Sequence, residues 1–411
     1  MLQIRSFGCT QYKAFRDPVV VELRPLTLFF GKNSSGKSAL LRLVRLLLRA
    51  ASGRSGRLRR GFPLEVDGLV YGTTFLDLVH GKLPNGCIDF HLALDQEIFP
   101  EPLELGVTVR HVQGALFDYP MVSHVRLNGE QWDWPLAQGI KRGVDHLEPE
   151  VPFSAGLWPD SRILHRELLA RIEACRPIIA DAEDCLTHLG PVRAPIKSVY
   201  KPEPPDSLAF NGDGFVNWLA RDPELLRQVG AWFETHLDGW RLALDVAGSM
   251  VECVLRKGGL SINMADAGQG MQQVLPVVVL QLAHQVGSTE PFLDLVEEPE
   301  SSLHAAAQAA LGDLFLATAQ LGRGQVLVET HSENLLLRIR RRIAEGRVAP
   351  DLVTLYWIED FPEGFSGVRR IHLLPDGSVD WWPAGVFSED YQEVRALRRA
   401  NLERKQKEEV A

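Results

Sequence analysis

One short segment constrains the fold of this chain more than any other feature: residues 31–38, GKNSSGKS. An apolar run that ends at Phe30 precedes it, and an apolar helical repeat begins at Leu40. Glycines at its first and sixth positions let backbone N–H groups converge on a phosphate at a helix N-terminus. The sequence therefore predicts a strand, a phosphate-binding loop and a helix. The expected nucleotide-binding residues of this loop are Gly31, Asn33, Ser34, Ser35, Gly36, Lys37 and Ser38.

Two members of this loop have separate chemical roles. Lys37 is expected to meet the β- and γ-phosphates of a nucleotide, and Ser38 to offer its hydroxyl to Mg²⁺. A phosphate loop alone does not name a reaction, because kinases, GTPases and motor ATPases share it. The rest of the sequence must therefore decide the chemistry.

A second apolar strand, residues 292–296, ends in the acidic sequence EEPE. We expect Glu297 to hold Mg²⁺ and Glu298 to orient the attacking water in phosphoryl transfer. Asp294 is a weaker alternative for the metal because it lies inside the strand. The other interpretation is that these are surface acids at a turn, where acidic residues favour a helix N-terminus.

Two further segments complete the predicted site. The apolar run 325–330 is followed by His331, which could sense the γ-phosphate or simply cap a surface turn. The segment 265–273, ADAGQGMQQ, opens an apolar helix, and a glycine-rich helix N-terminus can receive a phosphate from another subunit. A plain loop and helix cap is the alternative. The nucleotide-binding residues expected in this second segment are Asp266, Gly268, Gln269 and Gly270.

Apolar periodicity along the chain predicts alternating strands and helices, which is typical of a largely parallel sheet. The stretch 51–64 is rich in Gly, Ser and Arg and reads as a basic loop. The expected strands are 2–4, 19–21, 26–30, 240–246, 251–256, 292–296, 325–330 and 353–358, with antiparallel strands between 87 and 128. The first expected helix begins near residue 38. The other expected helices cover 161–189, 214–237, 270–283, 302–319, 333–345 and 388–409.

The bulk composition fits a globular protein of the cytoplasm. The 411 residues are 45% hydrophobic, and the N-terminus lacks the apolar stretch of a signal peptide. No apolar run is long enough to span a membrane. The five cysteines are scattered without a CxxC pair, which favours reduced thiols over a zinc site. A formal net charge of −9 argues against a uniformly basic nucleic-acid-coating protein, although a local basic surface is compatible with it.

Four motifs follow one another along the chain: the phosphate loop, the glycine-rich helix start, the acidic strand end and the histidine after a strand. In this order they resemble the ABC-class ATPases of the SMC and RecF-like branch. The phrases LGPVRAP, DAGQGMQQVLP, EEPESSLH, ETHSENLLLRIRRR and DWWPAGVFSED look more specifically like bacterial stand-alone AAA-type ATPases, relatives of the OLD proteins, with a C-terminal domain of unknown function. The resemblance maps residues 31–38 onto the Walker A motif, Glu297 and Glu298 onto Walker B with its catalytic glutamate, and His331 onto the switch histidine. It implies that two heads sandwich two ATP molecules, so that the protein is a homodimer or a higher homo-oligomer.

This sequence departs from the family pattern at three points. The serine of the Leu-Ser-Gly-Gly-Gln signature is absent, and Asp266 or Ala267 stands in its neighbourhood. No Q-loop glutamine is evident. Residues 71–75 stand roughly where one is expected, and Gln96 is only a guess. Glu297 replaces the usual Walker B aspartate and adds one methylene.

The expected fold is α/β: a P-loop NTPase of the ABC-ATPase head type, with a mixed or parallel core sheet flanked by helices, an antiparallel β subdomain and a helical lobe. Residues 1–360 would form the head. Its nucleotide core would come from about 1–50 and 265–360, and an insertion lobe from about 51–264. Residues 361–411 would form a small strand pair and a charged helix.

The expected function is hydrolysis of ATP to ADP and phosphate, with Mg²⁺, by an ATP-dependent dimer acting in DNA maintenance, repair or anti-phage defence on DNA or a partner effector. The alternative is an ATP-driven switch that regulates a separately encoded nuclease or toxin without binding DNA. A transporter ATPase subunit or a small-molecule kinase is a weaker hypothesis, and residues 361–411 are too few for an OLD-type nuclease domain. Contact with DNA phosphates would use Arg42, Arg45, Arg49, Arg54, Arg57, Arg59, Arg60, Arg338, Arg340, Arg341 and Arg342, unless these form an ordinary solvated face.

Overall fold

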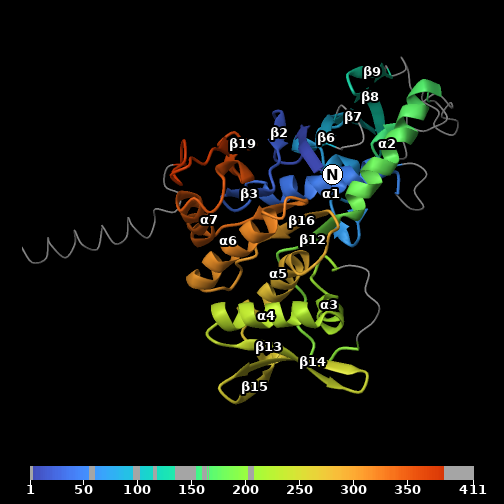
Figure 1. Ribbon diagram of the computed structural model, residues 1–411. Helices are drawn as coiled ribbons and strands as arrows, with labels where there is room; N and C mark the ends of the chain where they lie inside the picture. The colour runs from blue at the N-terminus through green and yellow to red at the C-terminus, as the bar shows by residue number, and fades with distance from the viewer. Residues whose placement is uncertain are drawn as a thin grey trace, which may run out of the picture.

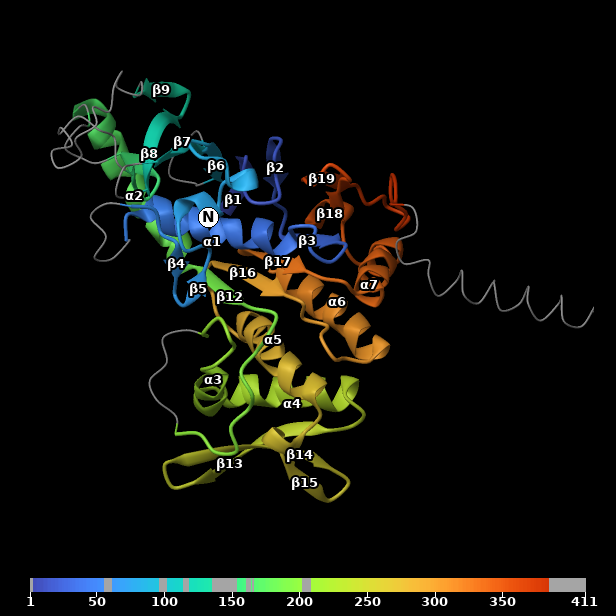
Figure 2. The ribbon, with the colours of Figure 1, turned by 180° about the vertical axis from the view of Figure 1, so that it is seen from behind.

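The computed structural model describes residues 3–54, 61–95, 102–113, 118–134, 154–159, 164, 166–201 and 208–383. This part of the chain contains two six-stranded sheets, a three-stranded sheet, two short hairpins and seven α-helices. Figures 1 and 2 show the parallel sheet at the centre, with the antiparallel sheet on one side of it and a helical lobe on the other. No helix within the described ranges is long and apolar enough to cross a membrane.

The central sheet, here called the core sheet, carries the phosphate loop at the end of one of its strands. Its first five strands are mutually parallel, and only β19 runs antiparallel to its neighbour β18. This confirms the largely parallel sheet predicted from the alternation of strands and helices. In order across the sheet, the strands are β12 (Leu186–Leu189), β16 (Phe292–Glu297), β17 (Gly324–Glu329), β3 (Leu26–Gly31), β18 (Val353–Asp360) and β19 (Ser366–Ile371).

Both faces of the core sheet are buried, which is why its strands are continuous apolar runs. Successive side chains of a strand point to opposite faces. Phe29 and Leu327 accordingly pack in a cluster with α1, α2 and the antiparallel sheet, whereas Leu28 and Val328 pack in a second cluster with the remaining helices. The helices are α1 (Lys37–Ser52), α2 (Arg166–Asp184), α3 (Phe215–Arg221), α4 (Pro223–His236), α5 (Gln269–Gln285), α6 (Ala305–Ala319) and α7 (Glu333–Ala344).

The second six-stranded sheet is entirely antiparallel and confirms the strands predicted between residues 87 and 128. The first two strands of the chain pair here and not with β3, so the N-terminal segment joins the two sheets. Across this sheet the strands are β2 (Val19–Glu22), β1 (Gln3–Thr10), β6 (Cys87–Asp95), β7 (Leu103–Gln113), β8 (Asp118–Leu127) and β9 (Glu130–Asp133).

The helical lobe consists of α3, α4 and α5 and ends in a three-stranded antiparallel sheet, at the bottom of Figure 1. This sheet contains β13 (Arg241–Ala247), β14 (Met250–Lys257) and β15 (Leu260–Asn263), and the first two confirm the predicted strands 240–246 and 251–256. The two short hairpins are β4 (Glu65–Val66) with β5 (Leu69–Val70), and β10 (Ser154–Ala155) with β11 (Trp158–Pro159).

Two predicted helices differ from the structure. Residues 161–189 were expected to be helical throughout, but α2 ends at Asp184 and residues 186–189 form β12 at the edge of the core sheet. The predicted helix 214–237 is two helices, because Asp222 is extended (φ −116°, ψ 97°) and Pro223 begins the second one. The residue before a proline is biased away from helical backbone, so the break is local in origin.

Several predictions lie outside the described residues. They include the C-terminal helix 388–409, the arginines at positions 57, 59 and 60, and Gln96. The proposed division into a head, an insertion lobe and a C-terminal unit stays a prediction.

Asp222 is expected to stabilise the break between α3 and α4. Its carboxylate accepts hydrogen bonds from the backbone N–H groups of Glu224 (2.9 Å) and Leu225 (3.0 Å). Asp222→Ala should lower the free energy of unfolding by about 1 kcal/mol, because two N-terminal amides of α4 lose their acceptor. Urea denaturation measures this effect, and Asp222→Asn serves as the control because asparagine also caps helices. Equal stability of the alanine and asparagine variants would contradict the role.

Candidate nucleotide-binding site

The segment 31–38 forms a tight loop between β3 and α1. Its two glycines lie so close to neighbouring atoms that a side chain would not fit. A Cβ on Gly31 would lie 2.6 Å from the carbonyl oxygen of Ile358. Gly36 has φ 98° and lies against the ring of Phe15, which a Cβ would approach to 3.1 Å. Gly36 is also the N-cap of α1 and has no side chain to cap the first amides. These amides therefore remain for an anion, as a phosphate loop requires.

Lys37 and Ser38 lie at the start of α1 and make different contacts. The Nζ of Lys37 donates hydrogen bonds to the carbonyl oxygens of Gly31 (3.1 Å) and Lys32 (2.7 Å), so the ammonium group folds back over the loop. Burial lowers the pKa of Lys37. The Ser38 hydroxyl donates to Oε1 of Glu329 at 2.8 Å. Within the same loop, Ser35 is buried and Asn33 and Ser34 are exposed.

Parallel pairing brings the ends of β16, β17 and β3 to one edge of the core sheet. Glu297 is the register partner of Glu329, and Glu329 is the partner of Phe29. The next residue, Glu298, donates its backbone N–H to the carbonyl oxygen of Glu329 at 2.8 Å. Glu298 has a positive φ of 44°, a conformation that is uncommon for a non-glycine residue and is concentrated at functional sites.

Glu297 is held by two partners, the partly exposed Arg42 and the fully buried His188. Its carboxylate accepts two hydrogen bonds from the guanidinium of Arg42, at 2.7 and 2.6 Å, and a third from Nε2 of His188 at 2.8 Å. Burial would raise the pKa of Glu297, but the hydrogen bonds from His188 and Arg42 hold it below its usual value. Both carboxylate oxygens are thus engaged within the protein. The assignment of Glu297 to the metal stays a prediction.

Glu329 also lies at this site, but it was not predicted from the sequence, although it ends an apolar strand just as Glu297 does. Burial and the neighbouring charge of Glu297 raise the pKa of Glu329 to about 7, against the effects of Ser38 and Lys37. Ligand atoms of Glu298, Glu329 and His331 all lie within 4.8 Å of one another. His331 is thus brought beside the acidic strand ends, as predicted, and burial followed by the charge of Lys37 lowers its pKa.

Arg193, in the phrase LGPVRAP, is a second residue whose role the sequence did not reveal. The residue is only 1% exposed, and its guanidinium donates to the carbonyl oxygens of Glu298 (3.1 Å) and Glu297 (2.6 Å). Its backbone exchanges two hydrogen bonds with the side chain of Gln273 in α5, at 3.0 and 3.1 Å. Burial lowers the pKa of Arg193 to about 10. This arginine therefore ties the acidic end of β16 to helix α5.

The segment 265–273 does not join the phosphate loop in this chain. Gly268, Gln269 and Gly270 line a separate cavity of about 520 Å³, together with Ser302 and residues of α4 and α6. A Cβ on Gly270 would lie 2.2 Å from the carbonyl oxygen of Ser302, so the start of α5 packs directly on the loop after β16. Asp266 is exposed and belongs to a short 3₁₀ turn, Met264–Asp266.

Asp294, the weaker candidate for the metal, is enclosed in the core. Asp294 accepts hydrogen bonds from Gln281 and His284 of α5 and is fully buried inside β16.

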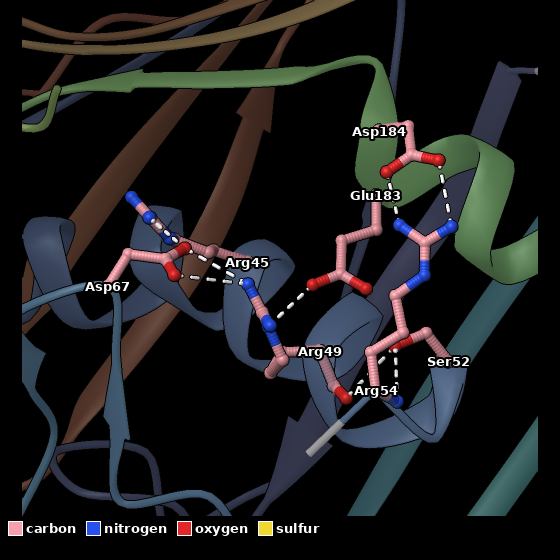
Figure 3. Close-up of polar contacts among 7 residues, drawn as sticks. All are labelled: Arg45, Arg49, Ser52, Arg54, Asp67, Glu183 and Asp184. Carbon is pink, nitrogen blue, oxygen red and sulfur yellow. Dashed lines mark hydrogen bonds and ion pairs between the residues drawn. The ribbon is translucent and has the colours of Figure 1, made fainter. Parts of the chain in front are cut away.

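The arginines at the end of α1 are neutralised within the chain. Figure 3 shows Arg45 and Arg49 against Asp67, Arg49 also against Glu183, and Arg54 against Asp184. Together with the pairing of Arg42 and Glu297, these contacts give each described arginine between residues 42 and 54 an acidic partner. The helix therefore does not present them as free cations.

The arginines of α7 are engaged in the same manner. Arg338 and Arg342 both pair with Asp313 of α6, and Arg341 and Arg342 pair with Glu345. The Nε of Arg340 donates to the carbonyl oxygen of Gly377 at 2.8 Å. Neither predicted DNA-contacting cluster is therefore a free basic surface within the described residues.

Arg193→Ala should lower the free energy of unfolding by about 3 kcal/mol or more, because it leaves two buried carbonyl oxygens without donors and removes a buried cation. Urea denaturation with tryptophan fluorescence measures this change. Arg221→Ala, at an exposed arginine of α3, is the control and should change stability by less than about 0.5 kcal/mol. Similar losses in the two variants would show that Arg193 has no special structural role.

Comparison with known proteins supports the same fold. A family model described as "AAA domain, putative AbiEii toxin, Type IV TA system" matches residues 137–338. The solved SMC head bound to the C-winged helix domain of ScpA is 13% identical, with coverage of 90% of this chain and 98% of that one, at a TM-score of 0.51. No curated protein matches the sequence.

Two further SMC heads are similar at lower scores. The head domain from Thermotoga maritima is 10% identical, with 90% and 100% coverage and a TM-score of 0.42. The head from Pyrococcus furiosus, bound to the C-terminal domain of ScpA, is 11% identical, with 97% and 100% coverage and a TM-score of 0.47. The likeness to the SMC head bound to the C-winged helix domain of ScpA confirms the predicted P-loop fold of the ABC-ATPase head type.

Proposed function

We propose that this protein binds ATP with Mg²⁺ at the carboxyl edge of the core sheet and hydrolyses it to ADP and phosphate as an ATP-dependent homodimer. The observation that carries the proposal is the convergence of four predicted residues at that edge. Lys37 and Ser38 begin α1, and Glu298 and His331 follow the neighbouring strands β16 and β17. A phosphate loop, a carboxylate and a histidine in this arrangement fit phosphoryl transfer to water.

In the proposed reaction, water attacks the γ-phosphate in line with the departing ADP. Lys37 stabilises the charge that spreads over the phosphate oxygens, and Glu298 orients the water. The half-buried position of Glu298 and its unusual backbone conformation support this role. Among the described residues, its carboxylate accepts a hydrogen bond only from the hydroxyl of Ser301, at 3.3 Å, and so remains available to a water molecule. His331, close to Glu298 at the same edge, would sense the γ-phosphate.

The donor set at this edge suits Mg²⁺. This ion prefers oxygen ligands and usually takes one or two carboxylates together with phosphate oxygens. Ser38 offers a hydroxyl, and Glu298 and Glu329 offer carboxylate oxygens within the same small cluster. When bound, Mg²⁺ supplies positive charge to the β- and γ-phosphates.

Exposed residues of the segment 265–273 support the proposed dimer. Asp266, Gly268 and Gln269 are exposed, and the glycines open helix α5 towards a cavity instead of towards the phosphate loop of the same chain. Such a helix start has amides to offer to a nucleotide held by a second copy. The packing of Gly270 on Ser302 would transmit closure of the dimer to the loop after β16.

For the biological role we propose an ATP-driven switch that acts on a partner effector in DNA maintenance or defence. The ion-paired arginines of α1 and α7 favour a protein partner over direct contact of these helices with DNA phosphates. The family description, which names a toxin of a toxin–antitoxin system, is compatible with a defence role.

The test is the variant Glu298→Gln. It should bind ATP as tightly as the wild type but hydrolyse it at least about 100-fold more slowly, since it removes the group that positions water. The variant should therefore accumulate as a dimer with ATP. Nucleotide binding, phosphate release and light scattering after size exclusion, each with and without ATP, measure the three expectations.

Glu290→Gln is the matched control, because it removes the same charge from an exposed position ahead of β16. It should behave as the wild type. Equal turnover by Glu298→Gln and wild type would exclude the assigned role of Glu298. Failure of the wild-type protein to bind ATP would overturn the function itself.

A further inference from the structure

Two glutamates end neighbouring strands at the proposed site, and their surroundings differ. Glu297 and Glu329 are register partners in β16 and β17, and both are at most 2% exposed. Every oxygen of Glu297 has a partner: Oε1 accepts from Arg42 and His188, and Oε2 accepts from Arg42. Glu297 is therefore a satisfied, charge-compensated carboxylate.

Glu329 is only half satisfied. Its Oε1 accepts a hydrogen bond from the hydroxyl of Ser38, the phosphate-loop residue expected at the metal. Its Oε2 is buried and has no hydrogen-bond partner among the described residues. Buried polar atoms in proteins are nearly always satisfied, so this carboxylate oxygen is available to a ligand that would complete it.

The unpartnered carboxylate belongs to a cluster of potential ligands. Glu329, Glu298 and His331 form the one group of at least three acidic, histidine or cysteine side chains with suitable spacing that the described residues contain. Glu297 is not a member of it. With the hydroxyl of Ser38, this edge offers the oxygen ligands that a hard divalent cation prefers.

Recruiting Glu297 to a cation instead would be unfavourable. Its carboxylate would have to leave Arg42, whose guanidinium is largely buried, and His188, which is fully buried. Separating a buried ion pair leaves uncompensated charge in a medium of low polarity. Glu329 carries no such constraint, because in the described part of the chain Ser38 alone donates a hydrogen bond to its carboxylate, and Lys37 and Arg42 act on it through charge only.

We propose that Glu329, together with Ser38, is the carboxylate that holds the Mg²⁺ of the bound nucleotide, and that Glu297 is a positioning residue that fixes Arg42 and His188. This inference rests on the proposed ATP binding and revises which residue serves the metal. The hydroxyl of Ser38 donates to Glu329 and keeps its lone pairs for the cation. Arg42 and His188 then secure the end of β16, from which Glu298 follows.

The experiment compares Glu329→Gln with Glu297→Gln in the full-length protein. Calorimetry measures the affinity for a non-hydrolysable ATP analogue with Mg²⁺ and with EDTA, and the ratio of the two affinities isolates the metal. Glu329→Gln should reduce this ratio by about 10- to 100-fold, while its affinity in EDTA stays close to that of the wild type. Glu297→Gln should keep the ratio, whatever it does to stability.

Electron paramagnetic resonance of Mn²⁺ gives a second readout that needs no turnover. The nucleotide complex of wild type and of Glu297→Gln should immobilise Mn²⁺, and that of Glu329→Gln should not. Glu329→Asp covers the case in which the glutamine variant does not fold. It keeps the charge on a shorter side chain, so its ratio of affinities with Mg²⁺ and with EDTA should lie between that of the wild type and that of a protein whose binding does not depend on the metal. Glu297→Asp should match the wild type.

The opposite pattern, with the ratio lost in the Glu297 variants and kept in the Glu329 variants, would overturn the proposal. An unchanged ratio in both sets would overturn it too. Either result would leave ATP binding by the wild type intact. A wild-type protein that binds the analogue equally with Mg²⁺ and EDTA, or not at all, would instead remove the proposed function.

Discussion

The parallel register of β16, β17 and β3 is the constraint on which the rest of the site depends. Pairing Glu297 with Glu329, and Glu329 with Phe29, brings two strand ends level with the phosphate loop. Because the carboxyl ends of parallel strands meet at the same edge of a sheet, groups that are almost 300 residues apart in the chain become neighbours: the hydroxyl of Ser38 bonds to Glu329, 291 positions away. Antiparallel pairing of either strand would carry these carboxylates to the opposite edge.

Crowding of acids at this edge has an electrostatic cost that the surrounding residues offset. Like charges in a buried place raise each other's pKa, which is evident at Glu329. Arg42 compensates Glu297 through two hydrogen bonds, and Arg193 supplies a second buried cation behind the same strand end. The two arginines come from distant segments, so the acidic strand end is stable only when α1 and the segment after β12 have both packed against it.

Arg193 also connects the site to the helical lobe. Its guanidinium bonds to the backbone of Glu297 and Glu298, and its own backbone bonds to Gln273 near the start of α5. Gly270 meets Ser302 in a second, independent contact between the same helix and the loop after β16. In the proposed dimer, a movement of α5 would therefore reach Glu298 through these direct contacts.

Much of the fold and part of the site could be predicted locally. Strand and helix periodicity, the glycines of residues 31–38 and the polar residues after two apolar strands depend on near neighbours in the chain, and these predictions agree with the structure. One error, the helix expected over residues 161–189, arose because a tertiary contact decided the outcome. Residues 186–189 became a strand because β16 offers them an open edge. Arg42 and Arg193 resemble ordinary arginines of a helix face and a loop until packing buries them against strand ends.

The sequence by itself determined that a phosphate loop exists and which acids and histidine follow the strands, because turn geometry and apolar runs are encoded by adjacent residues. Only the tertiary structure decided which of two equivalent glutamates is neutralised and which remains half satisfied. The reason is physical: Glu297 and Glu329 each end an apolar strand, but one strand lies beside β12 and the other beside β3. The first therefore meets His188 and Arg42, and the second meets Ser38 of the loop.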